Sequence, residues 1–167
     1  MAPPADALVH ALKYGGWSAA AGVMADRMAR RLREAHELPP GGVLVPIPTT
    51  AARRRRRGYD QSMRLARALS SRLGLPVASA LSRAGSRGSQ VALPVDQRRA
   101  NVFGAFGPGE KAGALGTHSH TILVDDVLTT GATAAAAVQA LTDLGVRRVF
   151  LVAFARTLPR PVAGSPT

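Results

Sequence analysis

The spacing of apolar residues along the chain predicts alternating strands and helices. Short uninterrupted apolar runs indicate strands that are covered on both faces, because such strands need no polar side. Segments in which apolar residues recur every three or four positions indicate helices with one buried face. The expected strands cover residues 43–47, 75–81, 101–106, 121–127 and 148–155, and the expected helices cover residues 5–36, 59–73 and 133–144.

The order of these elements predicts the fold class and the domain organisation. Strands that alternate with helices are typical of an α/β domain with a mostly parallel, Rossmann-like sheet and flanking helices. We expect one domain over residues 1–167, with N-terminal helices in residues 1–40 and a disordered tail at residues 160–167. Most of residues 83–106 lacks periodicity and is expected to form an extended loop, and residues 107–120 a turn-rich connector. Long loops of this kind are often functional.

The composition indicates anionic ligands but does not identify one of them. The net charge is +12, almost entirely from arginine, and the chain has no cysteine. A cationic excess attracts phosphates, nucleotides, nucleic acid or an acidic membrane, although an arginine-rich composition can also reflect a GC-rich genome. The lack of cysteine excludes disulfides and thiolate metal sites. No secretory signal is evident, and the most apolar early run, residues 17–25, is too short to span a bilayer. We therefore expect a cytoplasmic protein that does not engage a membrane.

The segment VDDVLTTGAT, residues 124–133, carries the strongest chemical signal in the chain. In a parallel sheet, ligands gather beyond the carboxyl ends of the strands, and this segment leads from a strand end into a helix. The first amides of a helix lack intrahelical partners and lie at the positive end of its dipole, so they can bind an anion. Gly131 lets the backbone approach that anion closely. We therefore predict a phosphate cradle formed by Thr129, Thr130, Gly131, Ala132 and Thr133.

Asp125 and Asp126 come shortly before the predicted cradle. Two adjacent carboxylates repel each other unless hydroxyl-bearing or cationic groups lie beside them. They can accept hydrogen bonds from the hydroxyls of a ribose whose 5′-phosphate lies in the cradle, and they can hold Mg²⁺ directly or through water. Taken singly, each feature also fits a surface turn or an ordinary helix start, because Asp and Thr often cap helices. The joint pattern favours a sugar phosphate.

Arg53 to Arg57 form a run of five arginines, which we expect in a loop after the first strand. There the guanidinium groups would face the same crevice and could pair with a pyrophosphate. A solvated cationic loop and a contact with nucleic-acid backbone are the alternatives. Nucleic-acid interfaces often interleave aromatic residues, and only Tyr59 is adjacent to the run.

The remaining polar residues give weaker signals. His118 and His120 are expected to be exposed connector residues, because no third metal ligand is evident. The chain holds no G-x-x-x-x-G-K-[ST] segment, no G-x-G-x-x-G segment after a strand and no Ser-His-Asp order. P-loop, dinucleotide-binding and serine-hydrolase functions therefore have no support.

Several segments together resemble the ComF family, the competence protein F-like type I phosphoribosyltransferases. ILVDDVLTTGAT, at residues 122–133, is similar to the signature with which these enzymes bind phosphoribosyl pyrophosphate (PRPP). Residues 45–69 resemble the family's VPVP…RGFNQ…LA segment, residues 89–106 its Q-x-x-L-x-x-x-x-R-x-x-N-V-x-x-A-F block, and residues 11–16 its LKY-G element. The resemblance spans about residues 8–156.

The resemblance implies a Mg²⁺-dependent phosphoribosyltransferase that transfers phosphoribose from PRPP to a nitrogenous acceptor. Asp125 and Asp126 would be the catalytic carboxylates, facing the ribose and Mg²⁺. Arg53 and Arg57 would contact the pyrophosphate. Residues 83–106 would form a hood over the substrate, with three hood and acceptor residues, Gln90, Arg98 and Asn101.

The family resemblance also implies a link to competence and DNA uptake, and the fold suggests a homodimer. A second interpretation is therefore a non-catalytic sensor of PRPP or nucleotides, or a single-stranded-DNA-binding accessory of the competence machinery. The sequence departs from the family at Asp60, where an amide usually stands, and it lacks the four-cysteine zinc segment that many members carry. Release of pyrophosphate from PRPP, tested against a panel of bases, distinguishes the enzyme from the binding module.

Overall fold

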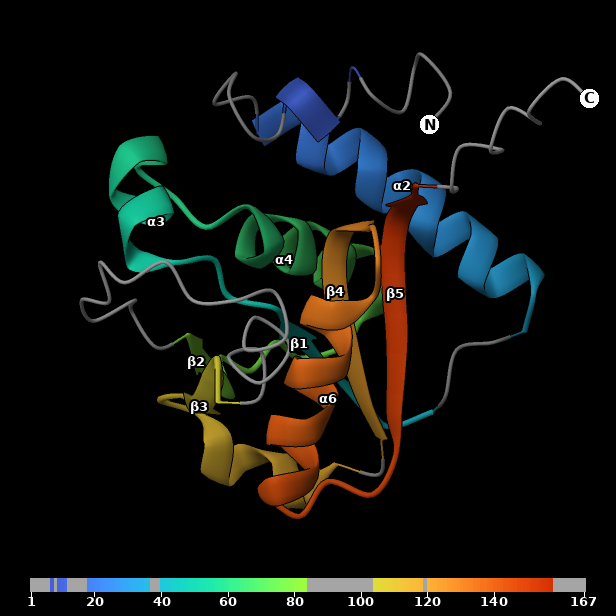
Figure 1. Cartoon of the computed structure of the whole chain (residues 1–167). Helices are drawn as coiled ribbons and strands as arrows, with labels where there is room; N and C mark the ends of the chain where they lie inside the picture. The colour runs from blue at the N-terminus through green and yellow to red at the C-terminus, as the bar shows by residue number, and fades with distance from the viewer. Residues whose placement is uncertain are drawn as a thin grey trace, which may run out of the picture.

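A three-stranded parallel sheet forms the centre of the computed structural model, which describes residues 7, 9–11, 18–36, 40–83, 104–118 and 120–157 (Figure 1). The strands are β1 (Gly42–Pro46), β4 (His120–Leu128) and β5 (Val149–Arg156), in the order β1-β4-β5. The register aligns Pro46 with Val124 and Val124 with Val152. The expected α/β fold with a mostly parallel sheet is confirmed. Residues 84–103, which make up most of the expected hood, and the expected tail at residues 160–167 lie outside the described residues.

Consecutive apolar residues in the strands supply two separate cores, one on each face of the sheet. Side chains alternate between the faces of a strand. One core holds Leu44, Ile122 and Val124, together with residues of helices α2 (Ser18–Glu34) and α4 (Gln61–Leu73). The other core holds strand residues of the opposite parity, with residues of helix α6 (Ala132–Asp143). Figure 1 shows α6 in front of the sheet and α2 and α4 behind it.

An ion pair joins the two helices behind the sheet. The Arg72 Nε of α4 lies 2.7 Å from the Asp26 Oδ1 of α2. This hydrogen bond raises the pKa of Arg72 and lowers the pKa of Asp26. The ion pair aligns the two helices with each other. Because Asp26 is exposed to solvent, the pair contributes little to the free energy of unfolding.

The prediction of a strand at residues 75–81 is largely wrong, and the strand predicted at residues 101–106 begins later than expected. Pairing in the first segment is limited to one parallel bridge, between Val77 and Leu44. The observed strands, β2 (Leu81–Arg83) and β3 (Phe106–Pro108), form a separate antiparallel pair in which Arg83 aligns with Phe106. The ladder extends in neither direction from this bridge, because Pro76 on one side and Pro46 on the other lack the amide hydrogens that the next bonds would need. The expected connector at 107–120 contains the 3-10 helix η1 (Ala112–Thr117).

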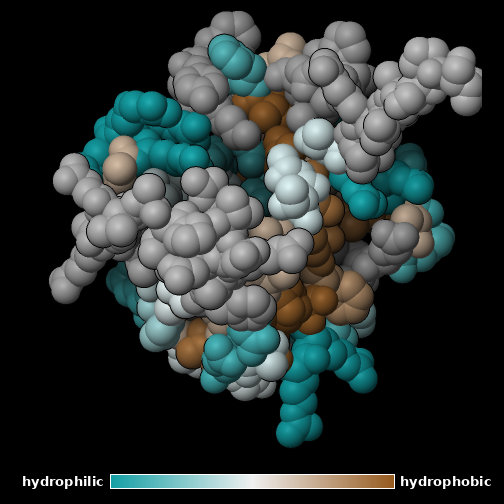
Figure 2. Space-filling model, in the orientation of Figure 1, coloured by the Kyte–Doolittle hydropathy of each residue, from teal (hydrophilic) through white to brown (hydrophobic). Residues whose placement is uncertain are grey.

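The surface divides into a strongly polar region over α3 (Ala51–Arg57) and an apolar strip along β5 (Figure 2). Phe150 and Leu151 are large apolar side chains of β5 with exposed fractions of 42% and 39%. No helix among the described residues is long and apolar enough to cross a membrane.

Gly109 is the tightest backbone approach among the described glycines and gives a direct test of the fold. A Cβ at Gly109 would lie 2.3 Å from the Ser79 carbonyl oxygen, whereas a Cβ at Gly113 would meet nothing within 4 Å. We expect Gly109→Ala to lower the free energy of unfolding by about 1–3 kcal/mol or more, because backbone cannot move aside cheaply. Gly113→Ala is the matched control. Equal melting temperatures for the two variants would contradict the packing of residues 79–81 against this turn.

Candidate anion-binding site

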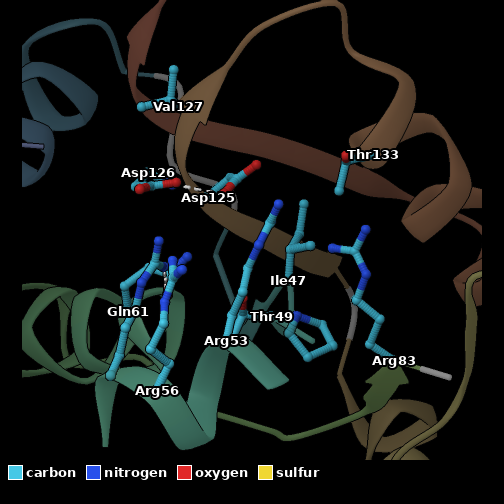
Figure 3. A pocket seen from close by; sticks show the side chains of 12 residues that line it. Ile47, Thr49, Arg53, Arg56, Gln61, Arg83, Asp125, Asp126, Val127 and Thr133 are labelled. Atoms are coloured by element: carbon cyan, nitrogen blue, oxygen red, sulfur yellow. Dashed lines mark hydrogen bonds between the residues drawn. The ribbon is translucent and has the colours of Figure 1, made fainter. Parts of the chain in front are cut away.

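A cavity of about 330 Å³ lies beyond the carboxyl ends of β1 and β4. Its walls come from the segment that leaves β1, from α3 and α4, from the end of β2, from β4 and from the start of α6 (Figure 3). This position is where ligands bind in parallel α/β sheets. The lining residues are Ile47, Pro48, Thr49, Arg53, Arg56, Arg57, Gln61, Arg83, Asp125, Asp126, Val127 and Thr133.

Both predicted carboxylates line this cavity. They lie inside β4, which continues to Leu128, so the sequence analysis placed the end of the strand one residue too early. β1 pairs with β4 only as far as Val124, so the end of β4 has no neighbouring strand on that side. Three successive residues, Asp125, Asp126 and Val127, line the cavity there. The Asp126 amide donates a hydrogen bond of 2.8 Å to the Asp125 Oδ1, and only 4% of Asp126 is exposed.

The predicted phosphate cradle forms the turn between β4 and α6. Gly131 is the N-cap of α6 with φ +81°, a conformation that favours glycine. The Thr130 Oγ1 accepts a hydrogen bond of 3.4 Å from the Ala132 amide. Of the five predicted cradle residues, only Thr133 is in the cavity wall. Thr129, Thr130 and Gly131 lie in the turn before α6, and Ala132 is the first residue of the helix.

The five arginines form helix α3, and the prediction of a loop at residues 53–57 is wrong. Thr50 caps the helix by accepting a hydrogen bond of 3.3 Å from the Arg53 amide, and Gly58 ends it with φ +77°. Arginine has a high helix propensity, so a run bounded by a threonine cap and a glycine stop favours a helix.

The helix divides the five arginines between two surfaces. Residues three and four apart share one face of a helix, and accordingly Arg53, Arg56 and Arg57 line the cavity. Arg54 and Arg55 are exposed and do not line it. The Arg57 Nη1 donates a hydrogen bond of 2.8 Å to the Gln61 Oε1 on α4. Arg53 and Arg57, the two arginines expected at the crevice, line the cavity, and the helical spacing adds Arg56 to them.

Asp60 fixes the chain between β1 and α4. Its Oδ2 accepts a hydrogen bond of 2.9 Å from the Thr49 amide. Its Oδ1 accepts hydrogen bonds from the Ser62 and Met63 amides, at 3.1 and 3.3 Å, and from the Ser62 hydroxyl, at 2.7 Å. The Ile47 carbonyl oxygen is a second acceptor within reach of the Ser62 hydroxyl, whose single proton can be donated to either oxygen. One carboxylate therefore holds Thr49 at the cavity and caps α4.

The cavity is electrostatically positive. Four arginines and two aspartates line it. Burial lowers the pKa of Arg83, the charge of Arg53 lowers it further, and Asp125 acts in the opposite direction. The cavity therefore suits a ligand with several negative charges.

Comparison with known proteins places the chain among bacterial DNA utilization and competence proteins. It is 32% identical over 160 residues to the DNA utilization protein YhgH of Salmonella typhi, covering 93% of this chain and 69% of that protein. It is 31% identical over 163 residues to YhgH of Escherichia coli O157:H7, with 94% and 69% covered. Competence protein F of Haemophilus influenzae is 30% identical over 128 residues, with 76% and 56% covered. The chain belongs to the ComF family. No protein-family model matches it.

The donor set of this ComF-family chain fits Mg²⁺ only in part. Mg²⁺ prefers oxygen ligands and usually takes one or two carboxylates together with water and substrate phosphates. Asp125 and Asp126 supply the carboxylates. Within the described ranges, no three His, Cys, Asp or Glu side chains are grouped closely enough to hold a metal ion. A bound phosphate ligand would have to supply further oxygens.

The structure adds no other predicted site residue to the described part of the cavity wall. Gln90, Arg98 and Asn101 lie outside the described residues of this ComF-family chain. His118 and His120 are half-buried, not exposed as expected, and they line a second cavity at the opposite ends of the strands, where the His120 ring packs against Phe150. Thr49 was expected only as part of the segment 49–57 over the pyrophosphate, and Gln61 and Arg83 were not expected in the site, because they are distant in sequence from the DD segment.

Replacing Asp60 with asparagine, the amide that usually stands at this position in the family, tests whether both carboxylate oxygens are needed. In Asp60→Asn the remaining oxygen can still cap α4, but the amide nitrogen cannot accept from Thr49. We expect a loss of about 1–2 kcal/mol, because the Thr49 amide is left without its acceptor. The exposed Asp143→Asn is the control, with an expected change within roughly 0.5 kcal/mol. Equal denaturant midpoints for the two variants would show that the second oxygen is not needed.

Proposed function

We propose that this ComF-family chain binds Mg²⁺-PRPP and transfers its phosphoribosyl group to a nitrogenous acceptor. One observation carries the proposal: adjacent carboxylates, the start of a helix and three arginines of α3 meet in one cavity. These groups match the three parts of PRPP, which are a ribose, a 5′-phosphate and a pyrophosphate. The relatives are named for competence and DNA utilization, so we assign the activity to the handling of DNA or its nucleotides, in the cytoplasm.

Each part of PRPP has a natural partner in the wall. The 5′-phosphate would lie on the turn at Gly131 and on the first amides of α6, where the helix dipole and backbone hydrogen bonds favour an anion. The ribose hydroxyls would donate to Asp125 and Asp126. The pyrophosphate would lie against Arg53 and its neighbours on α3, which can each donate two parallel hydrogen bonds.

The proposed reaction is a displacement at C1′ of the ribose. The bond from C1′ to the pyrophosphate oxygen breaks, and its electron pair leaves with the pyrophosphate. The lone pair of the acceptor nitrogen forms the new bond to C1′, and an acceptor N–H proton, where there is one, leaves with the pyrophosphate. Asp125 and Asp126 would stabilise the positive charge that develops on the ribose, and the α3 arginines would stabilise the departing charge. Bound Mg²⁺ would neutralise part of the pyrophosphate charge.

Charge-neutralising variants of the carboxylates test this assignment. Asp125→Asn with Asp126→Asn makes the cavity more positive, so simple attraction of anions predicts tighter binding of PRPP. The proposal instead predicts at least a tenfold loss of Mg²⁺-PRPP affinity by calorimetry, because the ribose and Mg²⁺ lose their acceptors.

The control for this test is Glu110→Gln with Asp143→Asn, two exposed carboxylates that do not line the cavity. It changes the net charge by the same amount and should leave PRPP affinity nearly unchanged. If the cavity variant binds Mg²⁺-PRPP as tightly as the parent and the control, the site assignment is wrong.

A second candidate function is single-stranded DNA binding by the outer face of α3. The observation that favours it is that Arg54 and Arg55 are exposed and lie off the cavity wall. Nearby, the Arg64 guanidinium lies 3.8 Å from the centroid of the Tyr59 ring. Arginines beside an arginine–aromatic stack are typical of surfaces that bind nucleic-acid backbone and bases.

Paired variants of the same helix separate the two functions. Arg54→Gln with Arg55→Gln should weaken single-stranded DNA binding and lower the slope of log affinity against log salt by roughly 1.4, since each lost phosphate contact on a single strand removes about 0.7. Arg53→Gln with Arg57→Gln should weaken PRPP binding instead. Equal salt slopes for the two variants would mean that α3 acts as one undivided cationic patch.

A further inference from the structure

Arg83 is a cation in the cavity wall that the proposed contacts with PRPP leave unused. It is the last residue of β2, and its guanidinium carbon lies 5.0 Å from the centroid of the Phe106 ring on the paired strand β3. Phe106 is buried, with an exposed fraction of 7%. Figure 3 shows Arg83 at one end of the cavity, Arg56 and Gln61 at the other, and Arg53 between them.

The surroundings of Arg83 disfavour its positive charge. It is half-buried, and both burial and the charge of Arg53 lower its pKa. Asp125 and the face of the Phe106 ring offset this cost in part. In the described part of the chain no carboxylate forms an ion pair with Arg83. A half-buried cation of this kind is expected to gain an anionic partner when a ligand binds.

The geometry of the displacement indicates which part of the ligand that partner belongs to. The acceptor nitrogen must approach C1′ from the side opposite the departing pyrophosphate. The arginines of α3 occupy the side assigned to the pyrophosphate, and β2 lies at the other end of the cavity (Figure 3). The acceptor would therefore lie against the part of the wall that Arg83 forms, where the buried Phe106 ring supports its guanidinium group.

We propose that the acceptor is a planar nitrogen heterocycle that carries a negative charge, such as a carboxylate, and that Arg83 binds this charge. This inference rests on the proposed phosphoribosyl transfer. Arginine pairs with a carboxylate through two parallel hydrogen bonds, which would fix the plane of the ring and aim its nitrogen at C1′. Arg83 thereby sets the specificity for the acceptor and takes no part in binding PRPP.

Pairs of probes that differ only in charge test the inference. The binding of nicotinate and nicotinamide, and of benzoate and benzamide, would be measured by NMR titration of the full chain with Mg²⁺ and PRPP present. Benzoate and benzamide have no ring nitrogen, so they report binding without transfer. We expect each acid to bind at least tenfold more tightly than its amide. No difference between acid and amide in either pair, whether both bind or neither binds, would overturn the inference.

Variants of Arg83 show whether this residue causes the preference. Arg83→Gln should remove the difference between acid and amide, Arg83→Lys should restore part of it, and both variants should bind Mg²⁺-PRPP as the parent does. If Arg83→Gln loses PRPP affinity as strongly as the variant of Asp125 and Asp126, the residue belongs to the PRPP site and the inference is wrong. If the parent chain itself binds no PRPP, the proposed function is wrong. That result differs from a failure of this inference, in which the parent binds PRPP but shows no preference for the acids.

Discussion

The parallel pairing of β1 with β4 is the constraint on which the site depends. Pro46 is level with Val124, and the Ile47 amide donates a hydrogen bond of 3.0 Å to the Val124 carbonyl oxygen. The chain that leaves β1 therefore passes directly beside Asp125 and Asp126. Because parallel strands end at the same edge of a sheet, the residues after β1 and those after β4 face one crevice. Apolar packing on both faces holds this register, since a slip by one residue would exchange the two cores.

The polar groups of the site are fixed by the scaffold around them. Asp60 joins the Thr49 segment to the start of α4, and the Arg57–Gln61 hydrogen bond joins α3 to the same helix. The arginines of α3 therefore lie on a capped helix, and the hydrogen bonds of Thr49 and Arg57 hold the chain in place before the helix and at its end. Four cations around two carboxylates is an unfavourable arrangement in isolation. Repulsion among the four arginines is typical of a site whose ligand supplies the missing negative charge.

The sequence predicted the central strands, the helices and the cavity residues with strong local signals. Consecutive apolar residues marked β1, β4 and β5, and the DD and TTGAT segments located the crevice. The run of arginines forms a helix and not the expected loop, and the signals for that helix are local: a threonine cap before the run and a glycine stop after it. Asp60 is likewise a local cap of α4, through its hydrogen bonds with Ser62 and Met63, and only its bond with the Thr49 amide depends on the fold.

Short strands and contacts distant in sequence could not be predicted in this way. β2 and β3 each have three residues, too few for a periodicity to appear, and Arg83 enters the cavity only because β2 pairs with β3. Both aspartates line one cavity because β1 ends level with Val124, and the place where β1 ends beside β4 is a tertiary feature. These are the positions at which packing against other elements outweighs the local pattern.

The central claim is that this cavity holds a ribose with its 5′-phosphate on the first turn of α6. A crystal structure of the chain with Mg²⁺ and PRPP tests it most directly. The account predicts the 5′-phosphate within hydrogen-bond distance of the amides at the start of α6, and the ribose hydroxyls against Asp125 and Asp126. PRPP bound only on the outer surface of α3, with the cavity holding none of it, would contradict the account.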